Sequence, residues 1–115
     1  MAENFNVIKY EDPSQDKEKD YIIYEAKNED KTFGGAKTYI ENDCLFISAL
    51  YVFPEYRRQH IASNILDYIT NDVKGQVKTI RCQILFTSEF GYENLIEMYE
   101  RKGFEYNIIY MTKTL

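Results

Sequence analysis

The stretch that decides the fold reads Val52-Phe53-Pro54-Glu55-Tyr56-Arg57-Arg58-Gln59-His60-Ile61-Ala62-Ser63-Asn64-Ile65-Leu66. An almost continuous apolar segment, residues 44–52, runs into it and ends at a proline, and two arginines then precede an amphipathic segment. A strand that leads through a basic loop to a helix N-terminus forms an anion site, because the first N–H groups of the helix have no partner and the macrodipole adds partial positive charge. The stretch therefore predicts a strand, a phosphate-binding loop and a helix.

The helix is predicted over residues 60–74 because apolar residues recur every four positions and a glycine follows. Gly75 is a suitable C-cap. The apolar stripe is formed by Ile61, Ile65, Ile69 and Val73, while Asn64, Asp67, Asn71 and Asp72 are expected to face water.

Strands are predicted over residues 4–10, 21–27, 32–40, 44–52 and 79–86, and a last strand carries the chain to residue 115. Residues 28–31 form a hairpin turn, Asn42 and Asp43 make a second turn within the antiparallel meander of the first strands, and residues 11–20 are a charged loop. A second helix carries Tyr92, Leu95, Ile96 and Tyr99 on one face and ends at Gly103. A strand–helix–strand unit implies a right-handed parallel crossover. We therefore expect one α/β domain over residues 1–115, whose mixed, mainly antiparallel sheet contains one parallel crossover.

The second helix supplies a second motif, Leu95-Ile96-Glu97-Met98-Tyr99-Glu100-Arg101-Lys102-Gly103-Phe104, which is followed by a strand. The two motifs, in this order and at this separation, resemble those of the GNAT superfamily of acyl-CoA-dependent N-acyltransferases. The resemblance covers roughly residues 22–115. It implies the GNAT fold, and acetyl-CoA as the co-substrate.

The resemblance also implies which residues bind the cofactor. In the family, an Arg/Gln-x-x-Gly-x-Gly/Ala loop holds the CoA pyrophosphate, and the backbone at the end of the preceding strand pairs with pantetheine by strand addition. An asparagine contacts the cofactor seven residues before a tyrosine. Here that position is Tyr92, and the nearest asparagine is two positions away. The implied cofactor-binding residues are Leu50, Tyr51, Val52, Arg57, Arg58, Gln59, His60, Ile61, Ala62, Ser63 and Asn94.

His60 stands where the family loop usually has glycine. Glycine allows the backbone to approach a phosphate closely and to adopt any φ. Two interpretations of His60 remain open: it presents its N–H at a negative φ and contacts phosphate through its imidazole, or it points to solvent at the start of a helix.

Tyr99 matches the family's tyrosine and is the implied catalytic residue, a general acid that protonates the departing thiolate, because a phenol stays protonated at neutral pH. The alternative is a purely structural tyrosine, since Tyr99 also lies on the apolar helix face. No proton acceptor is identified. The family's glutamate positions correspond to Phe46 and Thr87, and the nearby Glu41, Asp43 and Glu89 are expected to be solvated turn residues.

Composition excludes several classes of function. Nineteen acidic and fourteen basic residues give a net charge of −5, which disfavours nucleic acid as a partner and suits a cationic acceptor. The longest apolar stretches are too short to span a membrane, and the polar N-terminus predicts no secretory signal, so a cytoplasmic location is expected. Cys44 and Cys82 lack metal-ligand spacing and are predicted to be reduced core thiols, with a disulfide as the alternative.

The resemblance therefore implies an acetyltransferase that acts on a primary amine without a metal. The alternative is a GNAT-fold interaction module that binds CoA weakly or not at all. Typical family members place one or two helices between the first two strands, and residues 11–20 are too few for two. The acceptor side is therefore expected to be open, unless the protein is a homodimer rather than a monomer. An open site favours a protein lysine or N-terminus as the acceptor.

Overall fold

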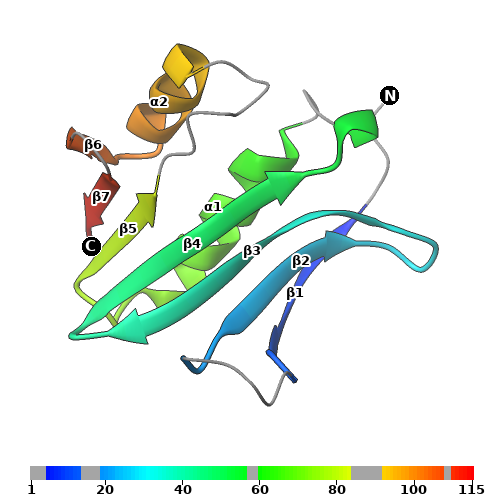
Figure 1. Ribbon diagram of the computed structural model, residues 1–115, viewed down its shortest axis with the longest axis horizontal. Coiled ribbons are helices and arrows are strands. Elements are labelled where there is room, and N and C mark those ends of the chain that lie inside the picture. The colour runs from blue at the N-terminus through cyan, green and yellow to red at the C-terminus, as the bar shows by residue number, and fades with distance from the viewer. Residues whose placement is uncertain (1–4, 14–18, 57–59, 84–91, 108–109) are drawn as a thin grey trace.

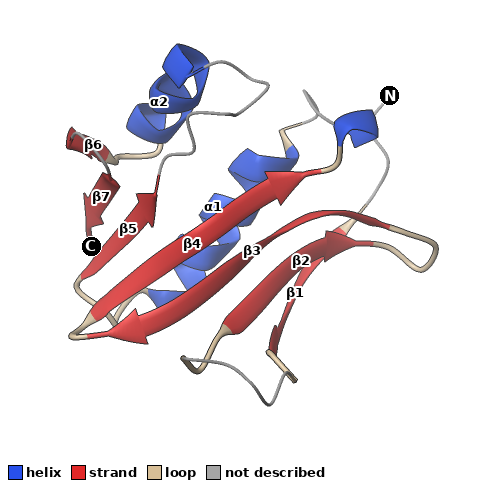
Figure 2. Ribbon diagram, in the orientation of Figure 1, coloured by secondary structure: helices blue, strands red, loops and turns tan. Residues whose placement is uncertain are grey.

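The computed structural model describes residues 5–13, 19–56, 60–83, 92–107 and 110–115 (Figure 1). The described residues form a sheet of seven strands with the order β1-β2-β3-β4-β5-β7-β6. Two helices and a short 3-10 turn complete the fold (Figure 2). The elements are β1 Asn6–Glu11, β2 Ile22–Lys27, β3 Thr32–Glu41, β4 Cys44–Val52, η1 Pro54–Tyr56, α1 Ile61–Val73, β5 Thr79–Gln83, α2 Tyr92–Arg101, β6 Glu105–Asn107 and β7 Tyr110–Thr114.

The first four strands form an antiparallel meander with turns suited to their sequences. In the β2–β3 turn, the Asn28 side-chain oxygen accepts hydrogen bonds from the backbone N–H groups of Asp30 and Lys31, at 2.9 and 3.0 Å. In the β3–β4 turn, Asn42 and Asp43 have φ of 53° and 59°, the left-handed pair that closes a two-residue hairpin. Both turns support the predicted meander.

The parallel crossover predicted from the sequence is present. β4 pairs in parallel with β5, with α1 between them in the chain, and β5 pairs antiparallel with β7. The mixed α/β sheet is therefore confirmed. One prediction is wrong in part: the single last strand is a hairpin, in which β6 pairs with β7 and Asn107 lies opposite Tyr110. Asn107 is the one turn-favouring residue at the end of β6, and the two isoleucines that follow it in the sequence resemble a continuation of the strand.

Both helices lie on the same face of the sheet, which we call the helix face. The Tyr24 hydroxyl of β2 donates a hydrogen bond to Asp72 of α1, and Tyr99 of α2 lies against Cys82 of β5. Across the sheet, Ile22 of β2 lies opposite Thr38, Thr38 opposite Ile47, and Ile47 opposite Cys82 of β5, so these four side chains share one face. Tyr24 follows Ile22 by two residues and therefore points to the same face as Cys82. The predicted stripe of α1, Ile61, Ile65, Ile69 and Val73, is buried there together with Leu66.

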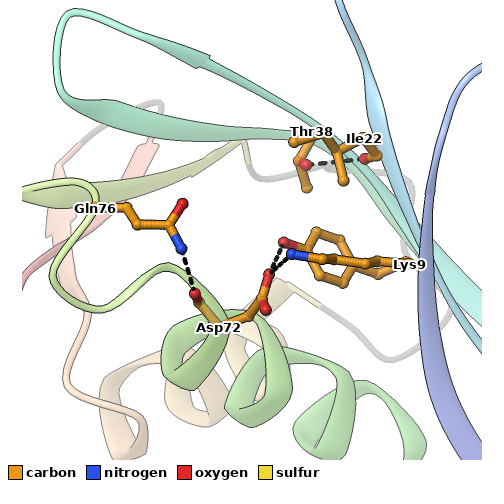
Figure 3. A network of polar contacts seen from close by, with 6 residues as sticks. Lys9, Ile22, Thr38, Asp72 and Gln76 are labelled. Atoms are coloured by element: carbon orange, nitrogen blue, oxygen red, sulfur yellow. Dashed lines mark hydrogen bonds and ion pairs between the residues drawn. The ribbon is translucent and has the colours of Figure 1, made fainter.

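Asp72 departs from its predicted place on the water-facing side of α1. Its carboxylate accepts hydrogen bonds from Lys9 Nζ of β1 and from the Tyr24 hydroxyl, both at 2.8 Å, and the Gln76 side chain donates to its backbone carbonyl at 3.0 Å (Figure 3). Burial acts to raise the pKa of Asp72, but the hydrogen bonds from Lys9 and Tyr24 hold it below its usual value. Asp72 therefore ties α1 to the first two strands.

Candidate active site

The second half of β4 bends away from β5. The parallel pairs run from Cys44–Thr79 to Ile47–Cys82, and in the described part of the chain Ala49, Leu50 and Tyr51 have a strand neighbour only on the β3 side. At this point the β3–β4 register shifts, because Lys37 lies opposite Ala49 and Thr38 opposite Ile47. The extra residue, Ser48, makes a β-bulge, which bends and twists a strand. Figure 1 shows β4 and β5 starting together and then separating. The bulge therefore opens one edge of β4.

Close packing with two glycines fixes this end of β4 against β3. A Cβ on Gly34 would lie 2.4 Å from the Tyr51 carbonyl oxygen and 3.0 Å from the Val52 Cα. Gly34 lies opposite Val52, and Gly35 lies opposite Tyr51. Leu50 is half-buried, Tyr51 is exposed and Val52 is buried. The three residues predicted to align pantetheine therefore form the terminal part of the opened strand.

The segment after β4 is anchored to the sheet before the chain enters α1. Phe53 donates its N–H to the Phe33 carbonyl at 3.0 Å, and Tyr56 donates to the Phe53 carbonyl at 2.9 Å. The Tyr56 and Phe33 rings meet edge to face at 4.7 Å between centroids. Arg57, Arg58 and Gln59 lie outside the described residues. Four residues separate the end of η1 from the start of α1, so the helix N-terminus comes shortly after the anchored segment in the chain.

His60 adopts the left-handed conformation that glycine favours. Its φ is 60° and its ψ is 23°, its side chain is exposed, and it makes no capping hydrogen bond. The φ is therefore not the negative one that the first interpretation of His60 required. Left-handed backbone costs an ordinary residue roughly 1–2 kcal/mol. Histidine occupies the glycine position of the loop at the expense of local strain.

The first residues of α1 divide between the core and the surface. Ile61 is buried, whereas Ala62 and Ser63 are half-buried. The first intrahelical hydrogen bond runs from the Asn64 N–H to the His60 carbonyl at 3.0 Å. The N–H groups of the first turn point along the helix axis, and the His60 side chain accepts no hydrogen bond from them. An anion placed beyond His60 would meet these donors.

Tyr99 lies in the core. It is 2% exposed, its hydroxyl oxygen is 2.8 Å from Cys82 Sγ, and its ring meets Phe104 at 5.4 Å between centroids. Burial raises the pKa of Tyr99 well above its usual value, so the phenol keeps its proton at neutral pH. Asn94 belongs to α2, but its side chain is outside the described part of the chain. Cys44 and Cys82 are both buried thiols, as expected, and are not joined by a disulfide.

The two described carboxylates that were considered as proton acceptors, Glu41 and Asp43, lie at the β3–β4 turn and contact other groups. Glu41 forms an ion pair with Lys19 at 3.0 Å, and Asp43 is exposed in the β3–β4 turn, where its carbonyl accepts the Lys78 N–H at 2.7 Å. Phe46 stacks on Tyr39 at 5.0 Å between centroids. Thr87 and Glu89 lie outside the described residues. Among the described residues, no group of three or more His, Cys, Asp or Glu side chains could hold a metal ion.

The sequence matches the family model described as an acetyltransferase (GNAT) domain over residues 19–106. This chain belongs to the GNAT acetyltransferase family. It is therefore an acyl-CoA-dependent N-acyltransferase. No curated protein sequence matches the chain.

Solved structures of GNAT proteins are similar to this chain in fold. The ribosomal-protein-S18-alanine N-acetyltransferase of Escherichia coli is 18% identical, covers 82% of this chain and 68% of its own, and has a TM-score of 0.71. A GNAT acetyltransferase of Elizabethkingia anophelis, solved with acetyl-CoA bound, is 14% identical over 96% and 99% of the two chains, with a TM-score of 0.73. An IAA acetyltransferase of Bacillus cereus is 12% identical over 96% and 100%, with a TM-score of 0.76.

In this GNAT protein, the sheet face opposite α1 and α2, which we call the open face, carries Tyr10 and Glu25, which no sequence motif marked, beside the side chain of Tyr51. No helix among the described residues packs on it, and a hydrogen bond from the Asp12 N–H to the Tyr21 carbonyl, at 3.0 Å, joins the two chain segments just beyond the ends of β1 and β2. Tyr10, Glu25 and Tyr51 lie on this face by register. In the sequence they look like ordinary outward-facing strand residues, and only the register across four strands brings them together.

Proposed function

We propose that this GNAT protein transfers the acetyl group of acetyl-CoA directly to a primary amine of a polypeptide, a lysine or an N-terminus, in the cytoplasm. The observation that carries the proposal is the opened edge of β4, where, among the described residues, Ala49, Leu50 and Tyr51 pair with β3 alone beside the bulge at Ser48. Such an edge offers backbone groups to an amide-containing ligand by strand addition. The pantetheine arm of CoA contains amides of this kind.

The phosphates of the cofactor are proposed to lie at the N-terminus of α1. Arg57, Arg58 and Gln59 would supply charge and donors, and the first-turn N–H groups of Ile61, Ala62 and Ser63 would add to them. His60 would border the phosphates from the left-handed conformation that glycine favours at this position, and Asn94 would add a further contact from α2. Because β4 leads to α1 through only eight residues, one cofactor can reach both parts.

In the reaction, the amine nitrogen attacks the thioester carbonyl carbon and the carbon–sulfur bond breaks. We assign Tyr99 as the donor of a proton to the departing thiolate, a role for which its high pKa keeps the proton available. For this step, the Tyr99 hydroxyl would leave its contact with Cys82 and form a hydrogen bond to the leaving sulfur instead. The amine would lose its proton to water, and water would return a proton to the Tyr99 phenolate.

A polypeptide acceptor is supported by the open face and by charge. The described residues place no helix over that face, so a small amine would find little of the enclosure on which small-ligand affinity depends. A polypeptide gains affinity along its length, and the net charge of −5 favours a basic segment. The similar Escherichia coli enzyme is named for an acceptor of this class, an alanine of a ribosomal protein.

The test combines cofactor binding with acceptor profiling. Acetyl-CoA at a hundred times its dissociation constant should stabilise the fold by about 2.7 kcal/mol, whereas free adenine should not. Labelled acetyl-CoA should then acetylate basic peptides in preference to polyamines, aminoglycosides or amino acids. An unmoved melting temperature would contradict the cofactor role and favour an interaction module. Efficient turnover of a small amine by a homodimer, with none on peptides, would contradict the polypeptide acceptor.

A further inference from the structure

The open face carries an exposed aromatic and aliphatic group around one carboxylate. The large apolar side chains that the structure leaves exposed include Ile8 and Tyr10 of β1, Tyr51 of β4, and Phe53 just after it, at 40, 40, 40 and 41% exposure. The Tyr51 and Phe53 rings lie 5.7 Å apart between centroids. Exposed apolar side chains that gather in one place mark a binding surface more often than single ones do.

The sheet register places the carboxylate within this group. Ile8 lies opposite Glu25, Glu25 opposite Gly35, and Gly35 opposite Tyr51, so the four positions form one row across β1 to β4. Directly paired residues point to the same face. A Cβ on Gly35 would lie 2.8 Å from the Tyr51 hydroxyl oxygen, so the Tyr51 ring leans over the glycine toward Glu25. The absence of a side chain at Gly35 makes this approach possible.

Tyr10 meets Glu25 from the other side. Partial burial, followed by the hydrogen bond that its hydroxyl donates to Glu25, raises the pKa of Tyr10 to about 12. Burial and the negative charge of Glu25 also raise the pKa of Tyr51. Both phenols therefore remain neutral, and they leave Glu25 as the charged group between them. Among the ion pairs of the described residues, none involves Glu25.

We propose that Tyr10, Glu25 and Tyr51 form a binding site for a basic side chain of the acceptor polypeptide, at a position near the amine that is acetylated. A carboxylate attracts a lysine or arginine side chain, and the faces of tyrosine rings attract the same cations. The acidic chain as a whole favours the same partner. This inference rests on the proposed acetyl transfer, and it adds a sequence preference to it.

The geometry of the sheet fixes how far the basic residue lies from the amine. Glu25 and Tyr51 are two strands apart, which corresponds to about 10 Å at the usual strand spacing. The backbone of Tyr51 belongs to the edge that we assign to pantetheine. An extended peptide advances about 3.3 Å per residue, so the basic residue is placed about three residues from the acceptor amine.

Binding of short labelled peptides to the acetyl-CoA-loaded protein tests the site directly. One peptide series carries a single lysine and one arginine, one to five residues away on either side; the reference peptide has alanine in place of the arginine. The wild-type protein should prefer arginine about three residues away by roughly tenfold over the reference, the effect of one charge-assisted contact. Glu25→Gln should abolish this preference. Glu25→Lys should reverse it in favour of a peptide with glutamate at that position.

Glu29→Gln is the matched control. Glu29 is exposed in the β2–β3 turn, and its replacement changes the net charge by the same amount. This variant should keep the wild-type preference. A wild-type protein with no preference at any position would overturn the site, as would a preference that survives Glu25→Gln or falls equally in Glu29→Gln. The melting-temperature shift with acetyl-CoA and acetyl transfer to the reference peptide report separately on the proposed function.

Discussion

The Tyr99 hydroxyl oxygen and Cys82 Sγ lie 2.8 Å apart in the core, where α2 meets β5. Burial raises the pKa of Cys82 to about 12, against the effect of its hydrogen bond with Tyr99, so the thiol is neutral and a poor nucleophile. The same residue that matches the family's general acid is therefore also part of a buried contact. Its catalytic and structural roles make different predictions.

Tyr99→Phe keeps the ring and its packing on Phe104 but removes the hydroxyl. The loss of one buried hydrogen bond should lower the free energy of unfolding by about 1 kcal/mol. If Tyr99 donates the proton, turnover should fall on the order of 10²-fold, with little change in acetyl-CoA affinity. Steady-state kinetics and calorimetric titration with acetyl-CoA separate the two effects.

Cys82→Ala is the matched control, because it removes the same contact from the other side and leaves the phenol in place. It should cost stability through the lost contact and a small cavity, and retain turnover to within a few-fold. Equal losses of turnover in the two variants would assign Tyr99 a packing role instead of proton donation.

The sequence predicted those features that depend on local patterns. The α1 stripe of Ile61, Ile65 and Ile69, the glycine after the helix, and the Asn42–Asp43 turn are local, and the structure has them as expected. Individual side-chain contacts between distant segments escaped, although the parallel pairing of β4 with β5 did not. Glu25 and Asp72 look like solvated polar residues until the sheet register brings Tyr10 to Glu25 and the packing of α1 on the sheet brings Lys9 to Asp72.

His60→Gly should stabilise the protein. Glycine adopts the observed φ of 60° without the Cβ clash, and this relief, less the added entropy of the unfolded chain, should raise the free energy of unfolding by about 1 kcal/mol or less. His60→Ala keeps the Cβ and therefore the strain, so it should bring no gain. Thermal unfolding of both variants measures the difference. Titration with acetyl-CoA tests whether the His60 imidazole contacts a phosphate. If it does, both variants should bind acetyl-CoA more weakly than the wild-type protein.

Asp72→Asn should destabilise the protein at neutral pH and matter little in acid. The folded state lowers the pKa of Asp72, so its stabilising contribution is complete above the ordinary carboxyl pKa of 3.8 and is lost as the pH falls through the lower folded value. Loss of charge-assisted contacts to Lys9 and Tyr24 should cost roughly 1–3 kcal/mol at pH 7. Urea unfolding from pH 7 down to pH 2 should show the two proteins converging.

Asp67→Asn provides the comparison on the same helix. The Asp67 carboxylate meets Lys102 at 2.8 Å but is 53% exposed, and an exposed pair contributes at most about 1 kcal/mol. If both variants lose the same free energy, the hydrogen bond from Tyr24 adds nothing to the Asp72 contact.

Gly34→Ala tests whether the close packing of β3 against the end of β4 serves the cofactor. Its Cβ would lie 2.4 Å from the Tyr51 carbonyl oxygen, a backbone atom, so the strands must move apart. Such overpacking costs roughly 1–3 kcal/mol, and the displacement should weaken acetyl-CoA binding because it moves the edge assigned to pantetheine.

Gly75→Ala has open space around its Cβ but a φ of 89°, so it should cost about 1 kcal/mol or more in stability and leave acetyl-CoA affinity at the wild-type value. Denaturant unfolding and calorimetric titration of both variants give the comparison. Gly34→Ala with wild-type affinity and reduced stability would separate the geometry of this strand end from cofactor binding.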